Sequence, residues 1–161
     1  MLKLWMACLL FLSGNEAIPW QTNKNFTGRV VAVKDGDTFD VMYKGKAQTI
    51  RLAHIDCPEN GQPYGKQAKQ FASTLCFGKE VRVVATNQKD RYKRLIAVVY
   101  MTDSININQE LVKAGMAWHF KQYSNDSSYY QLEQTARKNK TGLWQDKNAS
   151  PPWLWRKPKR K

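Results

Sequence analysis

The sequence predicts an α+β fold, a five-stranded β-barrel of the OB type with about three helices. Two observations support this prediction. Five short segments rich in β-branched and aromatic residues are separated by turn signals, as β-strands are. A segment with helical periodicity separates the third of these strands from the fourth, and further helical segments follow the fifth. This order of elements fits a small closed barrel.

Each expected strand ends at residues that favour a turn. Asp35-Gly36 follows the first strand, and Lys44-Gly45-Lys46 joins the second to the third. A polar turn, 87–94, joins the fourth strand to the fifth. The five predicted strands span residues 26–33, 39–43, 49–55, 81–86 and 95–101.

Three helices are expected between and after these strands. In residues 64–75, Ala68, Phe71, Ala72 and Leu75 recur at three- and four-residue steps, which is the spacing of one helix face. The second helix runs from a cap at Asn106 through residue 114 and ends at a glycine. The third runs from residue 127 or 128 to 139.

The C-terminal tail, 145–161, follows the expected domain, 26–144. Its prolines argue against a helix or a central strand at residues 151–155. We expect the tryptophans of the tail to pack on the domain and its last basic residues to stay mobile.

The composition favours a single globular domain that binds a polyanion. The 161 residues are 42% hydrophobic and include six Trp, seven Tyr and six Phe, which argues against disorder. The net charge of +13 predicts attraction to nucleic acid, with solubility or adhesion to anionic membranes and cell walls as alternatives. We expect a monomer.

The N-terminus, 1–17, reads as a signal peptide. Lys3 precedes an apolar run at residues 4–12, and cleavage after Ala17 is plausible although Asn15 makes the site imperfect. The run is too short to span a bilayer, which takes about 20 residues. We therefore expect export to the periplasm or the medium, without stable membrane insertion after removal. A buried first helix is the alternative.

Removal of the signal would also remove Cys8 and leave one pair of cysteines, Cys57 and Cys76. In an oxidising compartment these two can form a disulfide. Two small buried thiols are the alternative, and the sequence leaves both open.

Carboxylates and an arginine gather where the predicted strands end or turn. Asp35 and Asp37 follow the first strand, Arg51 lies in the third, and Asp56 and Glu59 follow it. Carboxylates are suited to Ca²⁺ or Mg²⁺, and one that is not bound to metal can accept a proton from water. Arginine matches phosphate oxygens. Together these residues predict metal-assisted hydrolysis of a phosphodiester.

Four segments give the chain a close resemblance to the thermonucleases, the staphylococcal nuclease-like family. They are 35–38 (DGDT), 51–59 (RLAHIDCPE), 64–68 (YGKQA) and 90–94 (DRYKR), in the family's order. The first alone is a common turn, but all four in order are hard to produce by chance. The resemblance covers about residues 26–144 and implies an OB-fold barrel that cleaves DNA and RNA with Ca²⁺.

The resemblance also implies roles for single residues. Asp37 and Asp56 match the metal ligands, with the backbone carbonyl of Cys57 as a further ligand. Glu59 matches the proposed general base. The family's pair of arginines at the scissile phosphate corresponds to Arg51 and Arg94.

Four further positions match residues that contact bound nucleotide. Arg91 and Tyr92 match positions that touch a terminal phosphate, and Trp118 and Phe120 stand where the family has two tyrosines beside the base. Lys93 stands where a glycine often precedes the last arginine of the turn, and this is a departure from the family's pattern.

We interpret Asp35 as a turn residue, because a glycine follows it. A non-catalytic OB-fold module that binds nucleic acid is the alternative to a nuclease. The presence of all three carboxylates and both arginines favours the enzyme.

Overall fold

The computed structural model describes residues 25–101 and 104–157 of the chain. The expected signal peptide and the last four residues of the tail, 158–161, lie outside the described residues. Within the described ranges, no helix combines the length and the apolar character that crossing a membrane takes.

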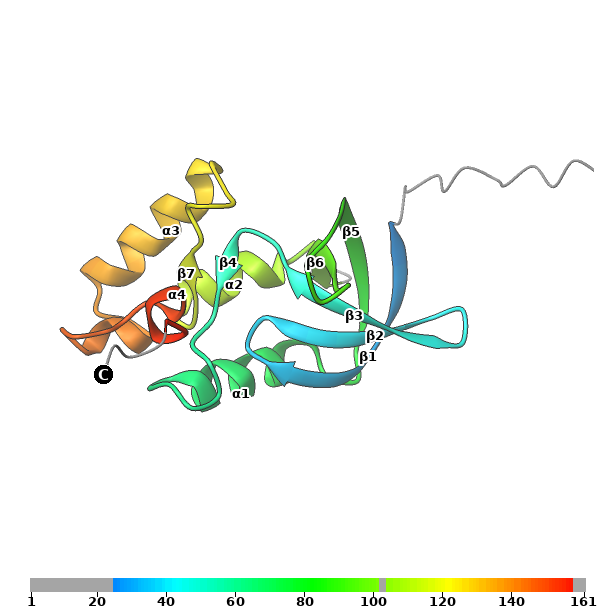
Figure 1. The fold of residues 1–161 in the computed structure, drawn as a ribbon, viewed down its shortest axis with the longest axis horizontal. Helices are drawn as coiled ribbons and strands as arrows, with labels where there is room; N and C mark the ends of the chain where they lie inside the picture. Colours follow the sequence, from blue (N-terminus) through cyan, green and yellow to red (C-terminus); the bar gives the residue numbers. More distant parts are fainter. Residues whose placement is uncertain (1–24, 102–103, 158–161) are drawn as a thin grey trace, which may run out of the picture.

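Five strands close into a barrel in the order β1-β2-β3-β6-β5 (Figure 1). Neighbouring strands are antiparallel except for β3 and β6, which are parallel, and β5 pairs with β1 to close the barrel. The expected α+β barrel of the OB type is thus confirmed. The strands are β1 Phe26–Asp35, β2 Thr38–Tyr43, β3 Lys46–Leu52, β5 Glu80–Lys89 and β6 Leu95–Met101.

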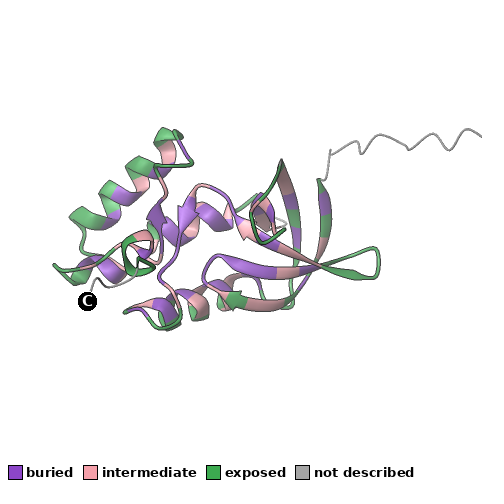
Figure 2. Cartoon of the chain, viewed as in Figure 1, coloured by how far each residue is buried: buried purple, intermediate pink, exposed green. Residues whose placement is uncertain are grey.

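Alternation of the side chains fills the barrel. In β6, Leu95, Ala97 and Val99 point inward and are buried, while the residues between them are partly exposed. The turn between β2 and β3 lies at the exposed tip of a hairpin (Figure 2). Each buried Val, Leu, Ile or Phe contributes about 1.5–3 kcal/mol relative to an exposed position.

Three helices lie at the predicted places: α1 Gly65–Cys76, α2 Ile107–Lys113 and α3 Ser127–Lys138. The first two pack on the barrel, and α3 packs on α2 and β7. Ala68 and Ala72 are buried on one face of α1, as the spacing predicts, whereas Phe71 and Leu75 are partly buried against the core and Cys76 completes the buried face. The side chain of Asn106 caps α2 by accepting a hydrogen bond from the Gln109 N–H. α2 packs against α1, β6 and α3, and so joins the barrel to the outer helix.

The prediction of one strand over residues 49–55 was wrong. β3 ends at Leu52, and Ile55–Asp56 forms a separate strand, β4, which pairs with β7, Trp118–His119. Between the two strands His54 has a φ of 69°, a left-handed conformation that breaks a strand. Long-range contacts hold this break, and the local sequence carries no signal of it.

The expectation that proline excludes a helix from the tail was also wrong. A short helix, α4, spans Pro152–Trp155 after a 3₁₀ turn, η1, at Gly142–Gln145. Pro152 stands in the first turn of α4, where its missing N–H is not needed. Trp153 packs on the domain as expected, whereas Trp155 is 45% exposed.

In the described part of the chain, Cys57 and Cys76 are free and buried. Burial raises the pKa of the Cys76 thiol to about 12 and raises that of Cys57 well above its ordinary value. Both therefore stay protonated at neutral pH and act as small apolar side chains.

Candidate active site

The turn between β1 and β2 brings the first carboxylates against β4. A Cβ atom at Gly36 would lie 2.8 Å from the Cβ of Cys57 and 2.9 Å from that of Ala68, so only glycine permits this approach. As a result, Oδ2 of Asp37 accepts a hydrogen bond of 2.8 Å from the backbone N–H of Cys57. Residues 20 positions apart in the chain are joined directly.

Arg51 lies between two of the carboxylates. Its Nη2 is 2.8 Å from Oδ1 of Asp56 and 3.1 Å from Oδ2 of Asp37. Its Nη1 donates to the carbonyls of Leu52 and Ile55, at 2.6 and 2.9 Å. Burial alone would lower the pKa of Arg51, but the charges of Asp37 and Asp56 outweigh this and raise it. Arg51 therefore stays charged and holds Asp37 and Asp56 together.

The carboxylate cluster carries more negative charge than Arg51 neutralises. Burial, and then the negative charge of Asp37, raise the pKa of Asp35 to about 7. Burial likewise raises the pKa of Asp56, although hydrogen bonds and charge from Arg156 and Arg51 oppose the rise. Crowding of buried carboxylates favours the binding of a cation.

These donors fit a hard divalent cation, because carboxylate oxygens are the ligands that Ca²⁺ and Mg²⁺ prefer. Within residues 25–101 and 104–157, no three His, Cys, Asp or Glu side chains are grouped closely enough to hold a metal alone. A cation here would need further oxygens, from backbone, water or substrate.

Glu59 lies at the mouth of this cluster on a loop that packs against α1. A Cβ atom at Gly65 would lie 1.8 Å from the carbonyl oxygen of Glu59, so glycine is required at the start of α1. The side chain of Gln62 accepts a hydrogen bond of 3.2 Å from the Glu59 N–H. The Glu59 side chain is 38% exposed and shares the guanidinium of Arg156 with Asp56.

Arg94 reaches the same place from the turn between β5 and β6. Its Nε pairs with Oδ2 of Asp90 at 2.6 Å, and its Nη1 donates to Oγ1 of Thr38 at 3.0 Å. That hydroxyl donates in turn to Asp37. Lys93 adopts the left-handed conformation, with a φ of 63°, which costs a side chain some strain and which glycine adopts freely. The structure nevertheless directs Arg94 toward Thr38 and Asp37.

Arg91 and Tyr92 extend from the same turn into solvent. Tyr92 is 64% exposed, and the guanidinium carbons of Arg91 and Arg94 lie 4.8 and 5.3 Å from the centre of its ring. The aromatic ring and the two charges form one exposed group beside the carboxylate cluster.

The two aromatic residues of β7 and the loop after it have different surroundings. Trp118 is buried, with its ring centre 4.3 Å from that of Trp144 and the guanidinium carbon of Arg137 at 4.8 Å. Phe120 is partly exposed and stacks on Trp153, with ring centres 5.3 Å apart and planes inclined by 5°. Trp118 is thus part of a packed cluster, and Phe120 is covered by the tail.

Two residues of the site were not predicted from the sequence. Asp35, read as a turn residue, is a third carboxylate of the cluster, and its spacing from Asp37 could have indicated this. Arg156, read as one of several charges in a basic tail, pairs with Asp56 and Glu59. No local signal marks Arg156, because it lies 100 residues from Asp56 in the chain.

One edge of the barrel thus carries oxygen ligands, a partly exposed carboxylate and two guanidinium groups, on a chain of net charge +13. An OB-type barrel with this arrangement indicates an enzyme that cleaves phosphodiesters, that is, a nuclease.

Comparison with known proteins agrees with this class. Residues 49–146 match the family described as staphylococcal nuclease homologue. An endonuclease of Escherichia coli, named as uncharacterized, is 46% identical over 129 residues, 80% of this chain and 84% of the relative. An endonuclease of Haemophilus influenzae, also named as uncharacterized, is 47% identical over 81% of this chain and 73% of its own. A micrococcal nuclease of Shigella flexneri is 41% identical over 83% and 82%.

The chain therefore belongs to the staphylococcal nuclease-like family, and it is a nuclease. The resemblance inferred from the motifs is confirmed. The matched range includes Arg51, Asp56, Glu59 and Arg94, whereas Asp37 precedes it and Arg156 follows it.

Proposed function

We propose that this nuclease is an exported, calcium-dependent endonuclease that hydrolyses DNA and RNA and leaves 3′-phosphate ends. The observation that carries the proposal is the meeting of Asp37 and Asp56 on a single guanidinium, that of Arg51, with Glu59 and Arg94 at the same edge. Side chains from two strands, two turns and a loop are gathered where a cation and a phosphate group can lie together.

Asp37, Asp56 and the backbone carbonyl of Cys57 are the proposed ligands of Ca²⁺. Bound Ca²⁺ would neutralise negative charge on a phosphate oxygen. Arg51 holds both carboxylates in position through its bonds to Asp37 and Asp56. The ligand set is incomplete by itself and leaves room for water and a substrate oxygen.

We assign to Glu59 the role of general base toward a water molecule. Its partial exposure supports this role, because the base must reach water. Arg94, together with the positive charge of Arg51, would stabilise the charge that develops on the phosphate oxygens. Departure of the 5′-oxygen gives the 3′-phosphate product.

The remaining assignments follow from charge and exposure. The net charge of +13 supports binding to both nucleic acids, and Arg91, Tyr92 and Phe120 are proposed contacts for phosphate and base. For Trp118, which is buried, we propose support of the Phe120 region. The basic and apolar N-terminal residues support export to the periplasm or the medium, and a monomer suffices because all proposed site residues lie on one chain.

The test is to incubate the purified mature protein with plasmid DNA and with RNA in the presence of Ca²⁺, Mg²⁺ or a chelator. We expect both substrates to be degraded with Ca²⁺ and to remain intact with the chelator. Removal of 3′-phosphates by a phosphatase should be needed before a polymerase can extend the products. Degradation that survives chelation would end the metal proposal.

Glu59→Gln provides the second part of the test. The variant keeps the size and the polarity of the side chain but cannot accept the proton, so we expect a rate at least about 10²-fold lower. Unaltered activity would remove Glu59 from the role of base.

A further inference from the structure

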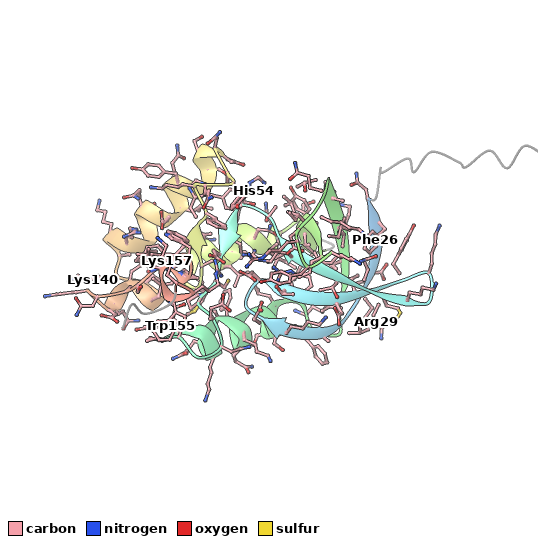
Figure 3. All side chains as sticks on the ribbon, in the orientation of Figure 1. Phe26, Arg29, His54, Lys140, Trp155 and Lys157 are labelled. Carbon is pink, nitrogen blue, oxygen red and sulfur yellow. The ribbon has the colours of Figure 1, made fainter. Side chains whose placement is uncertain are left out.

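The C-terminal strap, residues 150–157, folds back over the candidate active site. Its helix, α4, lies beside β4 and β7 in Figure 1, and Figure 3 labels Trp155 and Lys157 on it. Nη2 of Arg156 is 2.7 Å from Oδ2 of Asp56, and Nη1 is 2.5 Å from Oε1 of Glu59. One guanidinium therefore joins the proposed metal ligand to the proposed base.

Three further contacts hold the strap in this place. Nε2 of Gln62 donates to the carbonyl of Ser150 at 2.5 Å, while the Oε1 atom of the same side chain accepts from the Glu59 N–H. Pro152 is buried. Trp153 stacks on Phe120 and meets Trp118 edge-on at 5.8 Å. The strap is thus attached both to the loop of Glu59 and to the aromatic residues after β7.

Arg156 occupies oxygens that a metal ion would need. Both oxygens of Asp56 lie within 3.3 Å of its terminal nitrogens. A divalent cation takes carboxylate oxygens at about 2.3–2.6 Å, so it would stand against the positive guanidinium. A divalent cation and the Arg156 guanidinium therefore compete for these oxygens, because their mutual repulsion adds to the loss of ligand atoms.

The contact is nevertheless open to displacement. The Arg156 side chain is 41% exposed and that of Glu59 38%, so water reaches this ion pair, whereas the side chain of Asp56 is 1% exposed. Ion pairs that are open to water are weak, so the contact with Glu59 is the weaker half of the bridge. The strap helix is a single turn and has no side-chain cap. The strap can therefore open without disturbing the barrel.

We propose that Arg156 is an internal competitor of the divalent cation, and that cation binding requires the strap to release Asp56 and Glu59. This inference rests on the proposed calcium site. The apparent affinity for the cation equals the intrinsic affinity multiplied by the fraction of molecules with an open strap. A strap that is closed in about nine molecules of ten weakens binding about tenfold.

Calorimetric titration of Ca²⁺ into the full mature protein, without substrate, tests the proposal. We expect Arg156→Ala to bind Ca²⁺ about tenfold more tightly than the wild type. Lys157→Ala is the matched control: it removes the same charge from the next residue, for which the structure gives no salt bridge to the site, and should bind within about twofold of the wild type. Equal gains in both variants would show a general charge effect and overturn the proposal.

Trp153→Ala tests how release of the strap affects Ca²⁺ binding when no charge is removed. It loosens the stack on Phe120 without altering any charge, so it should also tighten Ca²⁺ binding. In the wild type, hydrogen exchange of the α4 amides should speed up when Ca²⁺ is added, because their bonds to the carbonyls of Pro151 and Pro152 would open with the strap. Slower exchange or no change would count against release.

The outcomes distinguish this inference from the proposed function. If the wild type and Arg156→Ala bind Ca²⁺ equally, or the variant binds it more weakly, only the role of Arg156 fails. If neither protein binds Ca²⁺, the proposed calcium site fails and the inference falls with it.

Discussion

Two arginines serve the candidate site in different surroundings. Arg51 is largely buried between Asp37 and Asp56, so replacing it with alanine would leave the buried carboxylate of Asp37 without its ion-pair partner. Such a loss typically destabilises a fold by about 3–5 kcal/mol. Arg94 stands at the edge, with bonds to Asp90 and Thr38. Arg94 is therefore the better position at which to separate chemistry from folding.

For Arg94→Ala we expect a fall in kcat/KM of about 10²–10³-fold, because one preorganised donor to the phosphate is lost. Initial rates on a fluorescent oligonucleotide measure this, and a melting curve verifies the fold. Lys89→Ala removes the same charge from the end of the same hairpin and should keep the wild-type rate. Rates within about twofold of wild type for Arg94→Ala would contradict its assigned role.

Asp35 makes stability depend on pH. Its pKa is about 7 in the fold, above the ordinary value near 4, so the fold favours the protonated form. Its stabilising contribution is full below about pH 4 and is lost as the pH rises toward 7.

Asp35→Asn should therefore be more stable than the wild type at pH 8, and the difference should vanish near pH 4. Melting temperatures in chelator across this range give the comparison, at about 2–4 °C for each kcal/mol. Asparagine retains the oxygen that accepts from the Asp37 N–H, which keeps the turn intact. A difference that stays constant with pH would argue against the raised pKa.

At the scale of elements, α2 holds the break between β3 and β4. The buried amide of Asn108 donates to the carbonyls of Ala53 and Ala97, at 2.9 and 3.2 Å, and accepts from the Val99 N–H at 3.1 Å. One side chain thus ties the barrel to the segment that carries Asp56. The position of the proposed metal ligand depends on a helix about 50 residues further along the chain.

Asn108→Ala should lower the free energy of unfolding by about 3 kcal/mol, because it leaves several buried backbone groups without partners. Urea denaturation measures the loss. Asn148→Ala is the control, because Asn148 is exposed. A surface substitution of this kind changes the free energy of unfolding by no more than about 0.5 kcal/mol. A change below about 1 kcal/mol at Asn108 would show that the break is held in another way.

At the scale of the whole molecule, the net charge of +13 governs the encounter with substrate. Each phosphate contact releases bound counterions, so affinity falls as salt rises. The carboxylate cluster is a local negative site within this positive field, which lets one molecule attract both a polyanion and a cation.

We expect binding to labelled single-stranded DNA, measured by fluorescence anisotropy in chelator, to weaken at least about tenfold between 50 and 200 mM salt. An uncharged peptide nucleic acid of the same sequence is the control and should show no comparable dependence. An affinity for DNA that does not change with salt would mean that the positive charge does not contact the substrate.

The sequence alone determined the barrel, its three main helices and the residues of the short motifs. Strand alternation, helix periodicity and turn residues act over a few positions, so they can be read directly. Asp37, Asp56 and Glu59 belong to such segments, and their chemical type already indicated a cation and a base.

Only the tertiary structure decided how these segments meet. The break at His54, the buried bridge of Arg51 to Asp37 and the return of Arg156 to Asp56 all depend on closure of the barrel and packing of the helices. Contacts between residues as far as 100 positions apart leave no periodic trace in the chain, because many partners are chemically equivalent until the fold selects one.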